Sequence, residues 1–397
     1  MPYDFDRIID RSGTFAIKCD AAPDALPMWV ADMEFETAPE VLEAIRQRAA
    51  HGVFGYTRFP EELREAYARW WKERHGLGIE PGWVLFANGV VPAISSMIRT
   101  LTSEGEKVLV QPPVYNMFYE CITKNNRMVL ENPLRLAEGQ RSASDGALRY
   151  EIDFEDLEAK LADPECRLML LCNPQNPSGR IWSRGELDRI WQLASKNGVT
   201  VISDEIHCDL ADPGYEYVPF GSVSPECLKS SITCVAPTKS FNLAGLHSSA
   251  VFVSDPVLRE KISRGMDTDG ISGLNAFAPA ATIAAFEKGG PWLDALCAYV
   301  AENKRLLAEF LAAELPQIRL VEGHATYMCW LDCRAVAEDD VPLQKFLRGE
   351  AKLFVSSGSA YGPGGRGFLR INLACPRSMV LEGLRRLKTG VLAFGKL

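Results

Sequence analysis

Lys239 stands in a setting that favours chemistry at its amine. It follows the apolar run 232–235 and Pro237, and a loop of small residues that includes Asn242 and Gly245 comes after it. The run predicts a short buried strand, and the small residues let the backbone approach something bulky. Burial disfavours the ammonium form, and a neutral lysine amine can form a Schiff base. The alternative is a loop lysine in solvent, so the choice depends on partners elsewhere in the chain.

Two charged residues are candidate partners. In VTVISDEIHCDL an apolar strand runs into Asp204 and Glu205, at the strand end where open parallel sheets bind ligands. A buried Asp204 there needs a cation or a protonated ring nitrogen to face, unless it only caps a helix. Arg370 lies at the centre of the apolar segment GFLRINLAC. A buried guanidinium must find an anion, either a bound carboxylate or an internal salt-bridge partner.

Other apolar runs end in residues that suit a flat phosphorylated ligand. The backbone amides of Gly89, Val90 and Val91, where a helix starts near Pro92, would suit a phosphate. Tyr115 follows a strand and a double proline, so its ring can lie on a flat ligand. Asn176 could donate to an oxygen on a bound ring, although a plain proline turn is the alternative. No GxGxxG motif is present, which disfavours a dinucleotide.

The elements that position these residues alternate between strands and helices. Apolar runs are predicted to form strands at 107–113, 127–133, 166–174, 199–206, 231–237 and 249–254, with helices at 153–162 and 183–198 between some of them, each opening at an Asp or Ser cap. Strands that are apolar on both faces and alternate with helices indicate an α/β fold. We expect a mostly parallel central sheet with helices on both faces.

The two ends of the chain predict a second domain. Residues 1–35 form an irregular arm, and helices are expected at 37–50, capped by Thr37, and at 61–75. After residue 278 a long helix with a bend at 289–291 leads to further short strands and helices. We therefore predict a large domain over residues 51–285 and a smaller α+β domain from residues 1–50 and 286–397.

Composition excludes several classes of function. The net charge of -9 and the scattered basic residues argue against binding nucleic acid or an anionic membrane surface. The N-terminus carries acids and arginines, and no apolar run is long enough to cross a bilayer, so we expect a cytoplasmic protein. The 11 cysteines contain no C-x-x-C pair, so neither a disulfide framework nor a metal site is predicted.

The motifs occur in a recognisable order: LPMWVADMEF, FGYT, NGVVPAI, QPPVY, NPQNPSGR, SDEIH, APTKSFNLAGL and FLRINLACPRS. In this order they resemble the fold-type I pyridoxal-phosphate enzymes of the aspartate aminotransferase superfamily. Within it, they are most similar to the cystathionine β-lyases and C-S lyases related to the MalY and PatB proteins. The likeness covers nearly the whole chain.

The resemblance implies pyridoxal 5'-phosphate as the cofactor and gives roles to the residues around its ring. Lys239 forms the Schiff base with the cofactor, and Asp204 pairs with the pyridine nitrogen. Tyr115 stacks on the ring and is a candidate to protonate the leaving group. Asn176 and His207 lie near the ring hydroxyl, although taken alone His207 is more typical of a packed core histidine.

The resemblance also places the phosphate and the substrate. The amides that follow Asn88, at Gly89, Val90 and Val91, together with Thr238, hold the phosphate, and Arg370 binds the substrate α-carboxylate. Tyr56 reaches the phosphate of the neighbouring subunit, which implies a homodimer with active sites at its interface. His247 stands where many aminotransferases of the superfamily carry an arginine, eight residues after the lysine.

The implied reaction is β-elimination from a sulfur-containing amino acid, which yields pyruvate, ammonia and a thiol such as homocysteine. The missing arginine disfavours the nearest alternative, an aminotransferase on the same fold. A more distant alternative is a cofactor-binding regulatory protein with vestigial catalysis, which the complete set of Lys239, Asp204 and Arg370 disfavours.

Overall fold

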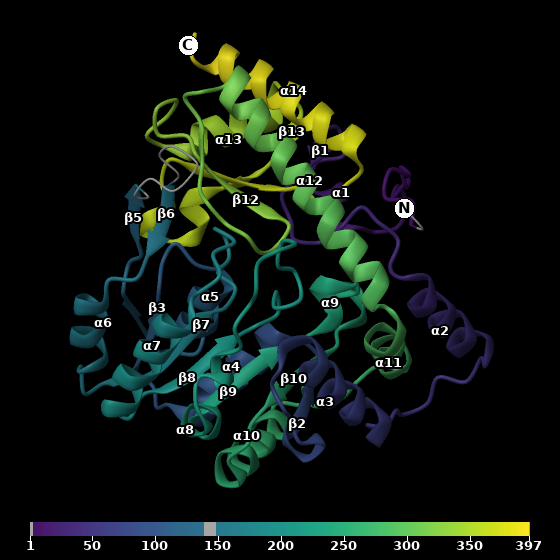
Figure 1. Cartoon of the computed structure of the whole chain (residues 1–397), viewed down its shortest axis with the longest axis vertical. Helices are drawn as coiled ribbons and strands as arrows, with labels where there is room; N and C mark the ends of the chain where they lie inside the picture. The colour runs from purple at the N-terminus through teal and green to yellow at the C-terminus, as the bar shows by residue number, and fades with distance from the viewer. Residues whose placement is uncertain (1–2, 139–147, 397) are drawn as a thin grey trace.

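A seven-stranded sheet forms the centre of the computed structural model, which describes residues 3–138 and 148–396 (Figure 1). The strand order is β2-β10-β9-β8-β7-β3-β4, and neighbours run parallel except at β10, which is antiparallel to β2 and β9. The mostly parallel α/β fold expected from the sequence is confirmed. The strands are β2 (Val84–Ala87), β3 (Lys107–Val110), β4 (Met128–Glu131), β7 (Cys166–Cys172), β8 (Thr200–Asp204), β9 (Ser231–Val235) and β10 (Ser249–Phe252).

Helices cover both faces of this sheet because its central strands are apolar on both sides. In β7, Leu168 and Leu170 are buried against one pair of helices, α4 and α10, whereas Met169 and Leu171 are buried against α6 and α7 on the other face. This alternation follows from the two-residue period of a strand. The helices are α4 (Val90–Leu101), α6 (Phe154–Leu161), α7 (Arg184–Lys196) and α10 (Pro256–Thr268).

The predicted helix caps are right at two helices and wrong at a third. Ser183 and Asp153 cap α7 and α6 through side-chain hydrogen bonds, as expected. Thr37 does not cap α2 (Pro39–Ala50), because Ala38 occupies the N-cap position and no side chain bonds there. The hydroxyl of Thr37 is instead buried without a partner among the described residues. Proline in the first helical turn fixes the start of this helix.

The chain beyond the large sheet builds a second layered unit. Its four antiparallel strands lie in the order β11-β12-β15-β14, and α12, α13 and α14 cover them around one apolar cluster. The N-terminal arm joins this unit, since β1 pairs in parallel with β13. The elements are β1 (Leu26–Pro27), β11 (Arg319–Leu320), β12 (Met328–Asp332), β13 (Leu353–Phe354), β14 (Ser356–Ser357), β15 (Phe368–Asn372), α12 (Gly290–Glu314), α13 (Asp340–Gly349) and α14 (Arg377–Phe394).

The expected bend at 289–291 is a complete break between α11 (Ala278–Lys288) and α12. Figure 1 shows α12 running from α11, beside the large sheet, to α14 at the far end of the molecule. The domain boundaries at residues 50/51 and 285/286 stay a prediction. No helix in the described ranges has the length and apolar character needed to cross a membrane. The remaining elements are α1 (Ile17–Asp20), α3 (Glu61–His75), α5 (Met117–Thr123), α8 (Pro225–Ser230), α9 (Pro237–Ser240), β5 (Arg135–Glu138) and β6 (Leu148–Glu151).

Candidate active site

A cavity of about 810 Å³ opens between the ends of the central strands and the smaller sheet. Open α/β sheets place their ligand sites at this edge. Most of the candidate residues from the sequence line this one cavity, although they come from distant segments of the chain. They are Gly89, Val90, Val91, Tyr115, Asn176, Asp204, His207, Thr238, Lys239 and Arg370.

Lys239 reaches into the cavity from the short helix α9, directly after β9. Its Nζ donates a hydrogen bond to the carbonyl oxygen of Ala31 (2.7 Å). Burial lowers the pKa of Lys239 to about 8, against the opposing effect of the Asp32 carboxylate. The neutral amine, which is the form that attacks a carbonyl carbon, is therefore far more populated near neutral pH than in an ordinary lysine.

Asp204 ends β8 and is buried in the same cavity. Its Oδ1 accepts a hydrogen bond from the amide of Ile206 (3.2 Å), and in the described residues it forms no ion pair. Burial raises the pKa of Asp204 to about 7. A protonated nitrogen beside this carboxyl would stabilise its ionised form.

Glu205, the other carboxylate at this strand end, points away from the cavity. It accepts hydrogen bonds from Ser203 Oγ (2.7 Å), from the Phe220 amide (2.9 Å) and from the hydroxyl of Tyr217. Because a buried carboxylate requires hydrogen-bond donors, these contacts indicate a structural role for Glu205 in the core. Only Asp204 of the two is left for a ligand.

Arg370 is buried in β15 with no anion beside it in the described part of the chain. One terminal nitrogen donates to Asn176 Oδ1 (3.0 Å) and the other to the carbonyl oxygen of Trp29 (2.9 Å), while Nε has no partner. The guanidinium also lies over the ring of Tyr361, at 4.9 Å from the centroid. The internal salt bridge considered from sequence is therefore absent there, and the charge remains available to a bound carboxylate.

His207 lines the cavity although it is buried. It is therefore both a packed histidine and a cavity residue, the two possibilities that the sequence left open. Burial lowers its pKa well below the usual value, so the imidazole is neutral. Its Nδ1 is buried without a partner, and so is Oδ1 of Asn88 in the same wall. Buried polar atoms without partners in a cavity are the atoms that a bound polar ligand would satisfy.

The part of the cavity lined by residues 88–91 suits an anion. Helix α4 begins at Val90, two residues earlier than the sequence predicted, because Gly89 already ends the loop. A Cβ atom at Gly89 would lie 3.1 Å from Pro92 Cδ, so a glycine lets the chain enter the helix here. The amides at the start of a helix lack internal acceptors. Thr238 and His247 also line the cavity.

Tyr115 follows β3 and lines the cavity. Burial raises its pKa above the ordinary value, and the charge of Asp204 adds to this rise. The phenol therefore keeps its proton through the physiological range and can act as a hydrogen-bond donor. Its ring packs edge-on against Phe118, with centroids 5.9 Å apart, which fixes its orientation.

The comparisons with known proteins agree with this arrangement. Residues 24–387 match the family of class I and II aminotransferases. The chain is 44% identical to the cystathionine beta-lyase PatB of Bacillus subtilis (strain 168), covering 98% of this chain and 99% of that protein. It is 36% identical to the protein MalY of Escherichia coli (strain K12), with coverage of 98% and 99%. The chain belongs to the class I and II aminotransferase family, in its PatB and MalY branch.

Solved structures give the same family. Cystalysin from Treponema denticola, which contains a pyridoxal 5'-phosphate cofactor, matches with a TM-score of 0.94 at 33% identity, over 99% of this chain and 100% of that one. The likeness therefore extends over both layered units and includes the elements that form the cavity.

Residues 29–35, here called the strap, line the cavity with Trp29, Val30 and Ala31 and bind several of its other residues. The strap carbonyl of Ala31 accepts from Lys239, and that of Trp29 accepts from Arg370. Asn242 bonds to the strap three times, to Met33 N (3.0 Å), Met33 O (3.1 Å) and Phe35 O (2.9 Å). The strap thus connects the loop after Lys239 to the strand that carries Arg370.

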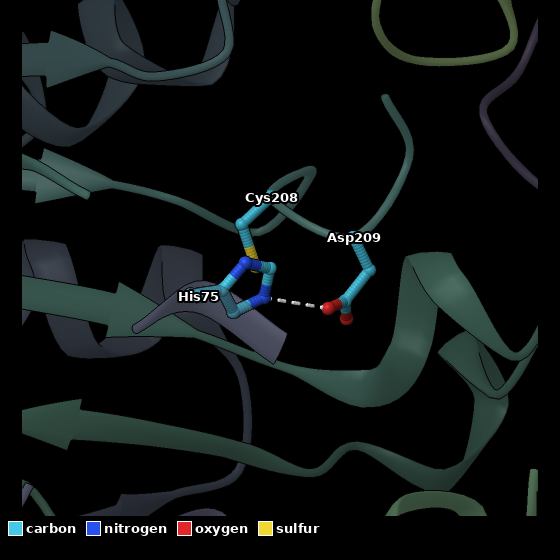
Figure 2. Close-up of side chains that lie close together, drawn as sticks. All are labelled: His75, Cys208 and Asp209. Atoms are coloured by element: carbon cyan, nitrogen blue, oxygen red, sulfur yellow. Dashed lines mark hydrogen bonds and ion pairs between the residues drawn. The ribbon is translucent and has the colours of Figure 1, made fainter. Parts of the chain in front are cut away.

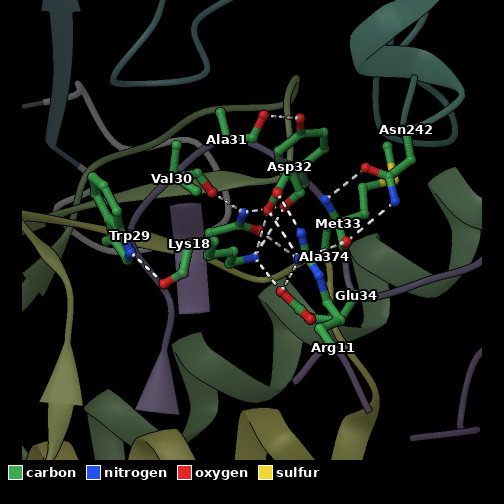
Figure 3. A network of polar contacts seen from close by, with 12 residues as sticks. Arg11, Lys18, Trp29, Val30, Ala31, Asp32, Met33, Glu34, Asn242 and Ala374 are labelled. Atoms are coloured by element: carbon green, nitrogen blue, oxygen red, sulfur yellow. Dashed lines mark hydrogen bonds and ion pairs between the residues drawn. The ribbon is translucent and has the colours of Figure 1, made fainter. Parts of the chain in front are cut away.

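Four charged side chains join the strap to the earlier part of the N-terminal arm. Lys18 is buried and pairs with Asp32 (3.2 Å) and Glu34 (2.7 Å), while Arg11 pairs with the same two acids at 2.9 Å each. Figure 3 shows the two cations meeting the two carboxylates. The sequence gives only a weak indication of this cluster: acidic and basic residues occur together in an arm that also contains apolar residues.

A second cluster, His75, Cys208 and Asp209 (Figure 2), lies next to Ser240, the residue after Lys239. The carboxylate of Asp209 already has partners, since it bonds to His75 Nε2 (2.8 Å), Trp70 Nε1 (2.9 Å) and Ser240 Oγ (2.8 Å). Burial raises the pKa of the Cys208 thiol well above its usual value. We interpret the cluster as an anchor for Ser240, the neighbour of Lys239, and not as a metal centre.

Tyr56 is the one candidate that does not line the cavity of its own chain. It lies in the segment between α2 and α3 and is fully exposed, at 111% relative accessibility. Val53 and Phe54 beside it are exposed as well, at 64% and 55%. The role of Tyr56 thus stays a prediction that depends on a second subunit.

Proposed function

We propose that the chain is a pyridoxal 5'-phosphate-dependent carbon-sulfur lyase of the cystathionine β-lyase type. It releases pyruvate, ammonia and a thiol such as homocysteine from a sulfur-containing amino acid. The observation that carries the proposal is a single cavity that holds a buried amine of lowered pKa, a carboxyl without a cation and a guanidinium without an anion: Lys239, Asp204 and Arg370. The near-full-length similarity to PatB supports this activity over transamination.

The cavity fits the cofactor at each of its polar groups. Asp204 would face the ring nitrogen, where a proton would favour its ionised form. The amides at 89–91, beside Thr238, would hold the phosphate. The unpartnered Nδ1 of His207 and the amide of Asn176 would face the ring hydroxyl. Lys239 supplies the amine that binds the aldehyde carbon.

Each step of the elimination is assigned to a different residue of this chain. When bound, the cofactor supplies an electron-withdrawing ring that makes the Cα proton of the amino acid acidic. Arg370 holds the substrate α-carboxylate and so fixes Cα relative to Lys239. The amine of Lys239, freed when the amino group of the substrate takes its place, would take the Cα proton, and Tyr115 would donate its proton to the departing sulfur. The enamine that remains after loss of the thiol hydrolyses to pyruvate and ammonia.

His247 supports the lyase branch. It stands eight residues after Lys239 and lines the same cavity, with its backbone in the left-handed region (φ 47°). Many aminotransferases of the superfamily have an arginine at this place, and an imidazole cannot supply its two-pronged binding of an anion. The phosphate then depends more on backbone amides and on groups from a second subunit.

We further propose a homodimer in which Tyr56 completes the site of the partner. The exposed Val53, Phe54 and Tyr56 on one short segment support this, because clustered exposed apolar residues are typical of association surfaces. We also propose a cytoplasmic location, which the 11 free cysteines support, since thiols persist in a reducing compartment. Amino acids with a thioether or disulfide sulfur on Cβ are the proposed substrates.

The proposal is tested by product analysis of the purified holoenzyme with L-cystathionine. We expect stoichiometric pyruvate and homocysteine, and no pyruvate from Lys239→Ala, which also loses the visible absorbance of the bound cofactor. Amino transfer to 2-oxoglutarate without pyruvate would establish the aminotransferase instead. Full cofactor occupancy with no turnover of cystathionine, cystine or S-alkyl cysteines would favour a regulatory protein.

A further inference from the structure

The cavity continues past Arg370 along a wall made by the smaller sheet and helix α13. This outer wall contains Gln344 and Arg348 from α13 and Phe354 from β13, and α13 packs against β13 (Figure 1). None of these residues belongs to the cofactor and α-carboxylate positions described above. The outer wall therefore faces the part of a substrate that extends beyond Cβ.

A continuous series of contacts joins Arg348 to Arg370. The guanidinium of Arg348 lies over the ring of Phe354, 4.3 Å from its centroid. That ring stacks on Trp29, with centroids 4.7 Å apart and planes 17° apart. The carbonyl oxygen of Trp29 accepts from Arg370 (2.9 Å) and from Ser356 Oγ (3.1 Å). The two arginines thus flank one aromatic and polar surface of the cavity.

The spacing along this surface suits a side chain of several atoms. Ser356 pairs with Arg370 across the small sheet, and Phe354 lies two residues before Ser356. Two residues of extended chain span roughly 7 Å. A substrate whose α-carboxylate is on Arg370 therefore brings atoms three or four bonds beyond the sulfur towards Arg348.

The charge of Arg348 is only partly compensated among the described residues, because the Asp24 carboxylate interacts with it at a longer range than an ion pair. One of its terminal nitrogens donates to the carbonyl oxygen of Ala21, and no carboxylate of the described chain lies within ion-pair distance. Asp24, an acid of the same region, pairs with Lys352 instead (2.6 Å). The planar aromatic support under Arg348 holds the guanidinium in place, so that its remaining N–H groups can meet a carboxylate.

We propose that Arg348 binds a second carboxylate, at the far end of the substrate's thioether side chain. This inference rests on the proposed lyase function and names its substrate class, amino acids whose sulfur carries a carboxylate-bearing arm. Gln344, whose Nε2 donates to the Val355 carbonyl (3.1 Å), lies beside it in the same wall. Small S-alkyl cysteines would fill the inner cavity and leave Arg348 without a partner.

The test compares two substrates of equal shape, S-(2-carboxyethyl)-L-cysteine and its uncharged amide, S-(2-carbamoylethyl)-L-cysteine. In the wild-type holoenzyme we expect a higher kcat/KM for the carboxylate, mainly through a lower KM. Arg348→Ala should reduce the carboxylate-to-amide ratio of kcat/KM roughly threefold to tenfold, because the pair is exposed and forms in high dielectric. Arg348→Lys should restore part of the ratio, since it keeps the charge without the fork.

Lys345→Ala is the matched control, because Lys345 lies on the same helix, is exposed and does not line the cavity. It should keep the wild-type ratio. An unchanged ratio in Arg348→Ala, or an equal fall in Lys345→Ala, would overturn the role of Arg348 and leave the lyase function intact. If neither these compounds nor L-cystathionine give pyruvate, the lyase function fails, and titration of the cofactor absorbance with the two compounds decides the carboxylate preference by itself.

Discussion

Asp204 is a buried carboxyl whose pKa is raised to about 7 by burial, at the end of the strand β8. In a core without a ligand such a group is destabilising when ionised, because its nearest donor is a single backbone amide. A protonated ring nitrogen would reverse this cost. Burial of the Asp204 carboxyl is thus unfavourable for folding but suits its proposed pairing with the ring nitrogen, a combination that is common at functional sites.

The charge of Asp204 is tested by Asp204→Asn, which keeps the size of the side chain. We expect kcat for pyruvate release to fall roughly 10²- to 10³-fold, the scale seen when one preorganised electrostatic group is removed. Asp163→Asn, which breaks a surface ion pair with Lys107 (2.7 Å), is the matched control and should keep its activity. A wild-type kcat in Asp204→Asn would contradict the role.

Lys239 leads to a pH prediction for the cofactor-free protein. Burial lowers its pKa to about 8, so the reactive neutral amine increases as pH rises towards 8 and changes little above pH 9. Trapping of pyridoxal phosphate by borohydride reduction should therefore accelerate between pH 6 and pH 9 and then level off. A rate that keeps rising to pH 10.5, the ordinary value for lysine, would show that burial does not lower this pKa.

At the scale of structural elements, the strap is the segment that holds the site together. Its carbonyl oxygens accept hydrogen bonds from Lys239, in α9 after the large sheet, and from Arg370, in β15 of the small sheet. The strap has no regular backbone ladder of its own over 29–35, so side chains satisfy its polar groups. The relative position of the amine and the guanidinium depends on this irregular segment.

Asn242 is the strongest single attachment of the strap. Asn242→Ala removes three hydrogen bonds and places alanine at a left-handed φ of 55°, so we expect the free energy of unfolding to fall by about 2 to 4 kcal/mol. Asn242→Gly loses the same bonds without the backbone strain and should be less destabilised by about 1 kcal/mol. Urea unfolding of the holoenzymes measures both, and equal stability of wild type and Asn242→Ala would contradict the attachment.

At the scale of the whole molecule, the site is proposed to be complete only in a dimer. Tyr56 is exposed in the single chain, whereas Lys239 is buried, so the two act in one site only if subunits exchange contributions. In a two-fold dimer each subunit gives Tyr56 to the other site. This arrangement can be tested without a structure of the complex.

Subunit complementation provides that test. Homodimers of Tyr56→Ala and of Lys239→Ala should each be nearly inactive. Unfolding and refolding them together should restore up to about a quarter of wild-type activity, because half of the dimers are hybrids and each hybrid has one intact site. No recovery, with hybrid dimers present by native mass spectrometry, would place Tyr56 in its own subunit's function.

Local patterns in the sequence were sufficient for the framework. The apolar runs before Asp204 and Lys239 predicted buried parallel strands, and the spacing of strands and helices predicted the doubly covered sheet. These signals are local, since a strand that is buried on both faces must be apolar throughout. The residues at strand ends follow from the same rule, because parallel strands bring their carboxyl ends together.

Tertiary structure decided which polar groups face the cavity and which are satisfied elsewhere. Glu205 and Asp204 are neighbours in sequence, yet the donors Ser203, Tyr217 and Phe220 turn one of them into the core. Arg370 depends on long-range partners in the same way, because its guanidinium donates to Asn176 and to the carbonyl oxygen of Trp29. The sequence by itself determined the elements and the chemical types, whereas hydrogen bonds and packing between distant segments determined the direction of each side chain.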